Sequence, residues 1–188
     1  MSQLKVNSIV PSGGLTSGAN GGIVQTVVSH MKARQSISGS LTFQPTGLSA
    51  TITPSSNNSK ILIVVNGIYN VYNATHTQFF CYFKLYNGTS EITDANSTGS
   101  TNNMWKTVFE VDSSSGNHQQ YEQLPLNGEY LYTHGGSAGT AITINLYASC
   151  HNGASPPTTP TTNQMYFNGR HQTNYGTTST MILYEIGG

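Results

Sequence analysis

The chain has 188 residues, a formal net charge of zero and only 7% charged residues, against about 25% in a typical soluble domain. Its seven Lys and Arg are scattered and form no basic patch, which argues against nucleic-acid binding. Disordered chains usually combine high net charge with few aromatic residues, so the 11 Tyr and 6 Phe indicate a folded protein.

Strand patterns recur at short intervals, and no segment of about a dozen residues has the period of a helix. Strands are expected at Ile23–Met31, Ile37–Phe43, Leu48–Thr53, Lys60–Tyr72, Thr77–Tyr86, Ser90–Thr93, Met104–Val111, Gln119–Leu126, Glu129–Thr133, Thr140–Ser149 and Ser179–Ile186, with a short one beginning at Tyr166 and Phe167. Strands of this length and spacing predict an all-β, antiparallel β-sandwich or jelly roll over residues 22–188.

Turn-forming residues set the expected boundaries between these strands. Pro45-Thr46-Gly47 separates two of them, while Asn87-Gly88 and Asn127-Gly128 are hairpin signals. Gly67 falls inside the most apolar strand, where it indicates a bulge. The proline-rich segment 151–162 is expected to be a long surface loop.

No motif in the sequence carries recognisable catalytic chemistry. None of the six His lies at metal-binding spacing, and phosphate-loop, calcium-loop and nucleophile-elbow motifs are absent from the sequence. Glu110 and Asp112 lie two apart on one expected strand; a glycosidase pair is conceivable, but a solvated pair at a strand end is favoured. We therefore expect no enzyme activity, no metal and no cofactor.

The two cysteines, Cys81 and Cys150, both fall inside expected strands. Small buried hydrophobic residues are the favoured interpretation, and a Cys81–Cys150 bridge is the alternative. The sequence contains no secretory signal and no apolar run near the ~18 residues of a transmembrane helix. We expect synthesis in a cytoplasm and no membrane insertion.

Sugar binding is a further candidate function, because aromatic and polar side chains on sandwich loops suit stacking on sugar rings. The candidate residues in or near expected loops are Trp105, His118, Tyr121, His171 and Tyr175. The alternative is that these side chains fill the core or a subunit interface. The low charge independently indicates that part of the surface is covered in an oligomer or larger assembly.

Residues 1–21 form an arm that contains too little apolar surface to order itself. Its apolar residues Leu4, Val6, Ile9 and Val10 are expected to anchor it to a partner, with a glycine hinge behind them. The hinge residues are Gly13, Gly14, Gly18, Gly21 and Gly22.

Three stretches together resemble small virion structural proteins of tailed bacteriophages, especially phages of marine bacteria and cyanobacteria. They are the N-terminal MSQLKVNSIVPSGGLTSGANGGIVQTV, the central TGLSATITPSSNNSKILIVVNG and the closing TSTMILYEI. The resemblance implies a jelly-roll domain, commonly trimeric, displayed on the virion surface as a knob, decoration or fibre tip. It also implies that the arm binds a capsid or tail protein, while host surface polysaccharide is a possible ligand of the outer loops.

Overall fold

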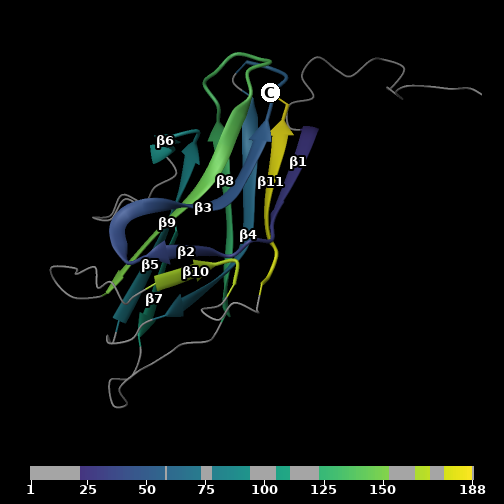
Figure 1. The fold of residues 1–188 in the computed structure, drawn as a ribbon. Helices are drawn as coiled ribbons and strands as arrows, with labels where there is room; N and C mark the ends of the chain where they lie inside the picture. The colour runs from purple at the N-terminus through teal and green to yellow at the C-terminus, as the bar shows by residue number, and fades with distance from the viewer. Residues whose placement is uncertain are drawn as a thin grey trace, which may run out of the picture.

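The computed structural model describes residues 22–57, 59–72, 78–93, 105–110, 123–152, 164–169 and 176–187. These residues form two antiparallel sheets and contain no α-helix (Figure 1). Sheet A contains β1 (Ile23–Met31), β2 (Gln35–Ser38), β4 (Lys60–Tyr72), β8 (Gln123–Thr133), β10 (Gln164–Phe167) and β11 (Ser179–Ile186). Sheet B contains β3 (Ser40–Ile52), β5 (Gln78–Asn87), β6 (Ser90–Glu91), β7 (Trp105–Glu110) and β9 (Ile142–Asn152).

The order of the strands is that of a jelly roll. Sheet A runs β1-β11-β4-β8, with β10 and β2 continuing it at one end, and sheet B runs β3-β9-β5-β7. Four strand pairs are therefore nested, each lying inside the previous one along the chain: β1–β11, β3–β9, β4–β8 and β5–β7. This arrangement results when one long hairpin is rolled up. The expected antiparallel jelly-roll fold is confirmed by this order.

The core lies between the two sheets and follows from period-two alternation. On β5, Phe79, Cys81, Phe83 and Leu85 are all 0% exposed and point toward sheet A. The ring of Phe83 meets Tyr69 of β4 edge to face, with 5.3 Å between the ring centroids. This contact joins the two sheets near the middle of the apolar layer.

Along one edge of β4, the paired strand changes beside Ile68 from β11 to β10. We call this change of partner the fork in sheet A. The fork leaves the backbone groups of Ile68 without ladder partners, and two buried polar residues satisfy them. The backbone N–H of Asn168 donates to the Ile68 carbonyl at 2.7 Å, and the Ile68 N–H donates to the Ser179 hydroxyl at 3.3 Å.

The Asn168 side chain closes the rest of the fork. Its amide nitrogen donates to the carbonyls of Met31 and Ala33, at the turn between β1 and β2. Its carbonyl oxygen accepts from the hydroxyls of Thr177 and Ser179. Asn168 is 0% exposed and has a φ of 60°, a conformation that Asn tolerates better than other side chains.

Several expected strands are confirmed at their predicted bounds, including Ile23–Met31, Lys60–Tyr72 and Ser179–Ile186. The hairpin at Asn87-Gly88 is also confirmed, since β5 and β6 pair directly across it.

The predicted hairpin at Asn127-Gly128 is wrong, because β8 continues through it and pairs with β4 along its whole length. Gly128 is needed there for close packing: a Cβ at this position would collide with the Trp105 ring.

The predicted turn at Pro45-Thr46-Gly47 is also wrong, because β3 runs through it. Within the described residues β3 pairs only with β9, and an edge strand tolerates proline. The register against β9 shifts on both sides of Gln44-Pro45, so bulges replace the turn.

The predicted bulge at Gly67 is wrong as well. The register between β4 and β8 runs unbroken past this residue. A Cβ on Gly67 would lie 2.8 Å from the Phe167 ring, so the glycine allows a close approach of that ring.

We expect Asn168→Ala to lower the free energy of unfolding by about 3 kcal/mol or more, because buried partners lose their hydrogen bonds and a non-glycine residue keeps a positive φ. Urea denaturation measures the change. Asn168→Gly loses the same side-chain hydrogen bonds but relieves the backbone strain. We therefore expect its free energy of unfolding to be about 1 kcal/mol higher than that of Asn168→Ala. Asn66→Ala, at an exposed position on β4, is the control. Equal stability of the Asn66 and Asn168 variants would contradict this role.

Candidate functional site

The outer face of sheet B carries a group of aromatic side chains. The register between β5 and β9 places Phe80 opposite His151 and Tyr82 opposite Ser149. Phe80, Tyr82 and His151 stack with near-parallel rings, at 5.4 Å between the Phe80 and His151 centroids and 5.2 Å between Tyr82 and His151. Alternation along β5 sends these rings outward while Phe79, Cys81 and Phe83 enter the core.

A bulge in β3 brings two further apolar side chains beside these rings. The register shifts between Ser40 and Gln44, so Leu41 and Phe43 lie where the ladder with β9 is interrupted. Together with the rings they enclose a groove of about 160 Å³, which we call the sheet B groove. It is lined by Leu41, Phe43, Tyr82, Ser149 and His151.

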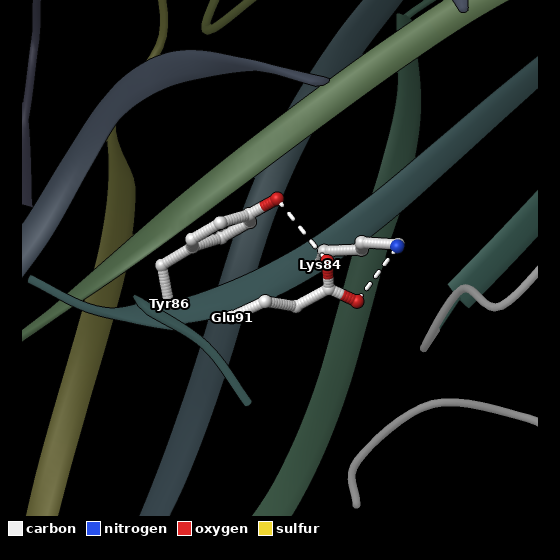
Figure 2. Close-up of polar contacts among 3 residues, drawn as sticks. All are labelled: Lys84, Tyr86 and Glu91. Atoms are coloured by element: carbon white, nitrogen blue, oxygen red, sulfur yellow. Dashed lines mark hydrogen bonds and ion pairs between the residues drawn. The ribbon is translucent and has the colours of Figure 1, made fainter. Parts of the chain in front are cut away.

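A charged network borders the sheet B groove without entering its lining. The Lys84 ammonium lies 2.7 Å from Glu91 Oε1 and 4.6 Å from the centroid of the Phe43 ring. The Tyr86 hydroxyl donates to Glu91 Oε2 at 3.4 Å, as Figure 2 shows. Burial, together with the Glu91 charge and this hydrogen bond, raises the pKa of the Tyr86 phenol.

The polar groups of the groove are neutral hydroxyls and an imidazole. Burial raises the pKa of Tyr82, with a smaller contribution from Cys81, so the phenol stays protonated at neutral pH. Ser149 is 2% exposed, and within the described residues its hydroxyl takes part in no hydrogen bond. A hydroxyl can both donate and accept, so this arrangement suits binding of an uncharged polar ligand.

Trp105 does not lie in an outer loop, contrary to expectation. It begins β7, is partly buried against the core, and its ring packs against Gly128 of sheet A. This favours the alternative that the aromatic fills the interior. His118, Tyr121, His171 and Tyr175 lie outside the described residues, so their sugar-binding role stays a prediction.

The arm residues Leu4, Val6, Ile9 and Val10 also lie outside the described residues, as do the proposed hinge positions Gly13, Gly14, Gly18 and Gly21. Gly22 is described, and its carbonyl accepts a 2.9 Å hydrogen bond from Gly187. That bond continues the pairing of β1 with β11, so any hinge begins before this residue.

Sequence reasoning did not identify the groove-lining residues. The alternation in FFCYFKLY showed that Phe80, Tyr82 and Lys84 share one face, and YASCH likewise places Ser149 and His151 together. The contribution of Leu41 and Phe43 depends on the irregularity in β3 between Ser40 and Gln44, which lies inside the expected strand Ile37–Phe43 and has no turn-forming residue to mark it.

The cysteines are fully buried free thiols that face each other across β5 and β9. Burial raises the pKa of Cys150 to about 12 and that of Cys81 well above its usual value. Such thiols are poor nucleophiles and behave as small core residues, which confirms the favoured interpretation.

Glu185 is a buried carboxylate, 1% exposed, that holds the loop between β3 and β4. Its Oε1 accepts three 2.7 Å hydrogen bonds, from the N–H and hydroxyl of Ser55 and the hydroxyl of Ser59. Burial raises its pKa, but these bonds and one from the Ser56 backbone outweigh that effect and lower it. The carboxylate therefore has a clear structural role.

The outer face of sheet A is rich in apolar side chains, which we call the sheet A face. One row across the strands contains Val28, Ile182 and Val64, and the next contains Tyr184, Leu62 and Leu131. Val28 is 50% and Leu131 48% exposed, and the others are partly exposed. Contiguous apolar surface of this kind marks an interaction site more often than a free surface.

Within the described part of the chain, no cluster of three or more His, Cys, Asp or Glu could hold a metal ion. Nor does that part contain a helix long and apolar enough to span a membrane.

No protein-family model matches the chain, and no curated protein matches it. Solved structures with similarity are particles of infectious bursal disease virus. The T13 viral particle gives 10% identity over 88% of this chain and 36% of that chain, with a TM-score of 0.40. The VP2 subviral particle gives 11% identity over 88% of this chain and 38% of that chain, with a TM-score of 0.34. The structure of the Gx strain gives 11% identity over 97% of this chain and 42% of that chain, with a TM-score of 0.36. The chain spans less than half of each, and the jelly-roll assignment rests on strand order alone.

We expect Glu185→Gln to reduce the free energy of unfolding by about 2 kcal/mol at pH 7, because three hydrogen bonds lose a charged acceptor. An unperturbed Glu has a pKa of about 4.3, and the folded-state pKa of Glu185 lies below its unfolded value. The stabilisation is therefore complete above the unfolded pKa and disappears as pH falls through the folded pKa.

Denaturation of both proteins between pH 7 and pH 2 measures this difference. It should shrink toward the acidic end, while exposed Glu129→Gln stays within about 0.5 kcal/mol of the parent throughout. A Glu185→Gln difference that is independent of pH would contradict the role of the charge.

Proposed function

We propose that this chain is a non-enzymatic structural protein of a tailed-bacteriophage virion. In this proposal it forms a trimeric knob or decoration on the particle surface and is attached through its N-terminal arm. The alternative placement is a small tail-fibre tip that recognises host glycan. The resemblance of the three sequence stretches supports the virion assignment, and the sheet A face carries the proposal of assembly.

The sheet A face favours burial against another protein. Its half-exposed Val28 and Leu131 would each contribute on the order of 1 kcal/mol when association completes their burial. Charged residues on this face are sparse: Lys60 and Glu129 lie at its exposed positions on β4 and β8. Few charges must therefore be desolvated when subunits associate, which agrees with the low charge of the whole chain.

The position of β1 connects this face to the arm. Within the described residues β1 pairs only with β11 and forms an edge of sheet A (Figure 1). Ile23 and Val24, at its start, are 61% and 56% exposed. Residues 1–21 lead directly into this edge, so an arm bound to a partner would hold the sheet A face near that partner.

Light scattering tests the assembly. We expect the full-length chain to be a trimer and the double substitution Val28→Lys, Leu131→Lys to shift it to monomer, because two charges would enter the interface. Thr89→Lys, in the exposed turn of sheet B, is the matched control and should stay trimeric. A parent that is monomeric at micromolar concentration, or a double variant that stays trimeric, would overturn the interface.

Labelling of virions tests the placement. Gold-labelled antibody against the purified chain should decorate the particles of the phage that encodes it, on the capsid for a knob and at the tail for a fibre tip. A chain that begins at Gly22 should keep its oligomeric state but fail to bind particles that lack the protein. Absence of label from intact and from opened particles would refute the virion role.

A further inference from the structure

We propose that the sheet B groove binds one neutral pyranose ring, the unit of a polysaccharide or glycan. The site is formed by strands β3, β5 and β9, and it contains none of the loop residues that the sequence suggested for sugar recognition. Its volume of about 160 Å³ corresponds to roughly five water molecules at ~30 Å³ each. That is space for one six-membered ring.

The lining of the groove combines apolar walls with groups that both donate and accept hydrogen bonds. Leu41, Phe43 and the Tyr82 ring provide the apolar surface, while the hydroxyls of Tyr82 and Ser149 and the His151 imidazole are polar. A pyranose has the matching combination, because its C–H groups form apolar faces and its hydroxyls lie around the edge. Small-molecule sites generally have this composition of apolar walls with a few polar groups.

The Ser149 hydroxyl distinguishes a sugar from an apolar side chain of a protein partner. It is directed to the groove, in a residue that is 2% exposed, and makes no hydrogen bond within the described residues. An apolar occupant would remove water from this hydroxyl without replacing its hydrogen bond, a loss of about 1–3 kcal/mol. A sugar hydroxyl restores the bond, so the groove favours a polyol.

The electrostatics of the site favour a neutral sugar over an acidic one. The ammonium of Lys84 is already paired with Glu91 at 2.7 Å and lies 4.6 Å from the centroid of the Phe43 ring, which lines the groove. Binding of a carboxylated or sulfated sugar would compete with that pair and bring a second anion near Glu91. Lys84 therefore offers no uncompensated positive charge to an acidic ligand.

The location of the groove is compatible with the proposed assembly but does not depend on it. Sheets A and B are opposite layers of the sandwich, so a subunit that associates through the sheet A face leaves the sheet B groove pointing away from the contact. Sugar binding is a property of the isolated chain and can be measured in solution. Its failure would leave the surface-knob placement unaffected and would count only against the glycan-binding fibre tip, whereas failure of the virion role would leave sugar binding by the isolated chain unaffected.

Saturation-transfer NMR of the full chain tests the proposal with methyl glycosides of glucose, galactose, mannose and N-acetylglucosamine. Glucuronic acid and phenol serve as the acidic and apolar probes. We expect at least one neutral glycoside to bind with a Kd in the millimolar range. Ser149→Ala and Tyr82→Phe should each weaken that binding about tenfold, as expected for loss of one hydrogen bond to a neutral ligand.

Tyr184→Phe, on the opposite sheet A face, is the matched control and should leave the Kd unchanged. Thermal unfolding confirms that each variant is folded, and Tyr82→Phe retains the ring if Ser149→Ala is unstable. The proposal is overturned if no neutral glycoside binds, if phenol or glucuronic acid binds more tightly than every glycoside, or if folded Tyr82→Phe binds as the parent does.

Discussion

The fold depends on the hydrogen bonds that hold sheet A together at the break where β4 changes its strand partner. Along one edge of β4 the partner changes from β11 to β10, and the neighbouring row changes from β1 to β2 at the same level. Asn168 fills the break with its backbone N–H and both ends of its amide, and Ser179 completes it. Without these bonds, the backbone groups of Ile68 and the carbonyls of Met31 and Ala33 would lose these partners, and an unsatisfied group costs about 1–3 kcal/mol where it is shielded from water. The jelly roll can therefore change strand partners inside a buried layer.

The two sheets present different outer surfaces. Sheet A continues as a regular ladder on the β1 side of the break, where its outward positions are Val, Ile, Leu and Tyr. Sheet B is instead interrupted at its edge, where the bulges in β3 bring Leu41 and Phe43 beside the rings of β5 and β9. A regular apolar ladder provides a broad surface suited to another protein. An interrupted edge provides a concave one suited to a small ligand.

The sequence was sufficient to predict the fold class because each core strand has its own period-two pattern. The bounds of Ile23–Met31, Lys60–Tyr72 and Ser179–Ile186 were predicted correctly from their apolar, strand-forming residues. The turn signals failed where tertiary packing decided the outcome. Asn127-Gly128 lies inside β8 because β4 pairs across it and Trp105 occupies the space that a side chain on Gly128 would need. Such a pairing joins residues about sixty apart, which no local pattern reports.

The candidate site was less predictable than the fold for the same reason. Alternation along β5 identifies Tyr82 as outward-facing, but its burial to 5% exposure depends on neighbours from distant strands. The ring stack requires the β5–β9 register, and the groove requires the irregularity between Ser40 and Gln44 that positions Leu41 and Phe43. A single outward aromatic on a sandwich is unremarkable in sequence, since it can equally cover the core or meet solvent. It becomes a candidate ligand contact only when a polar group such as the Ser149 hydroxyl lies beside it in the same concave surface.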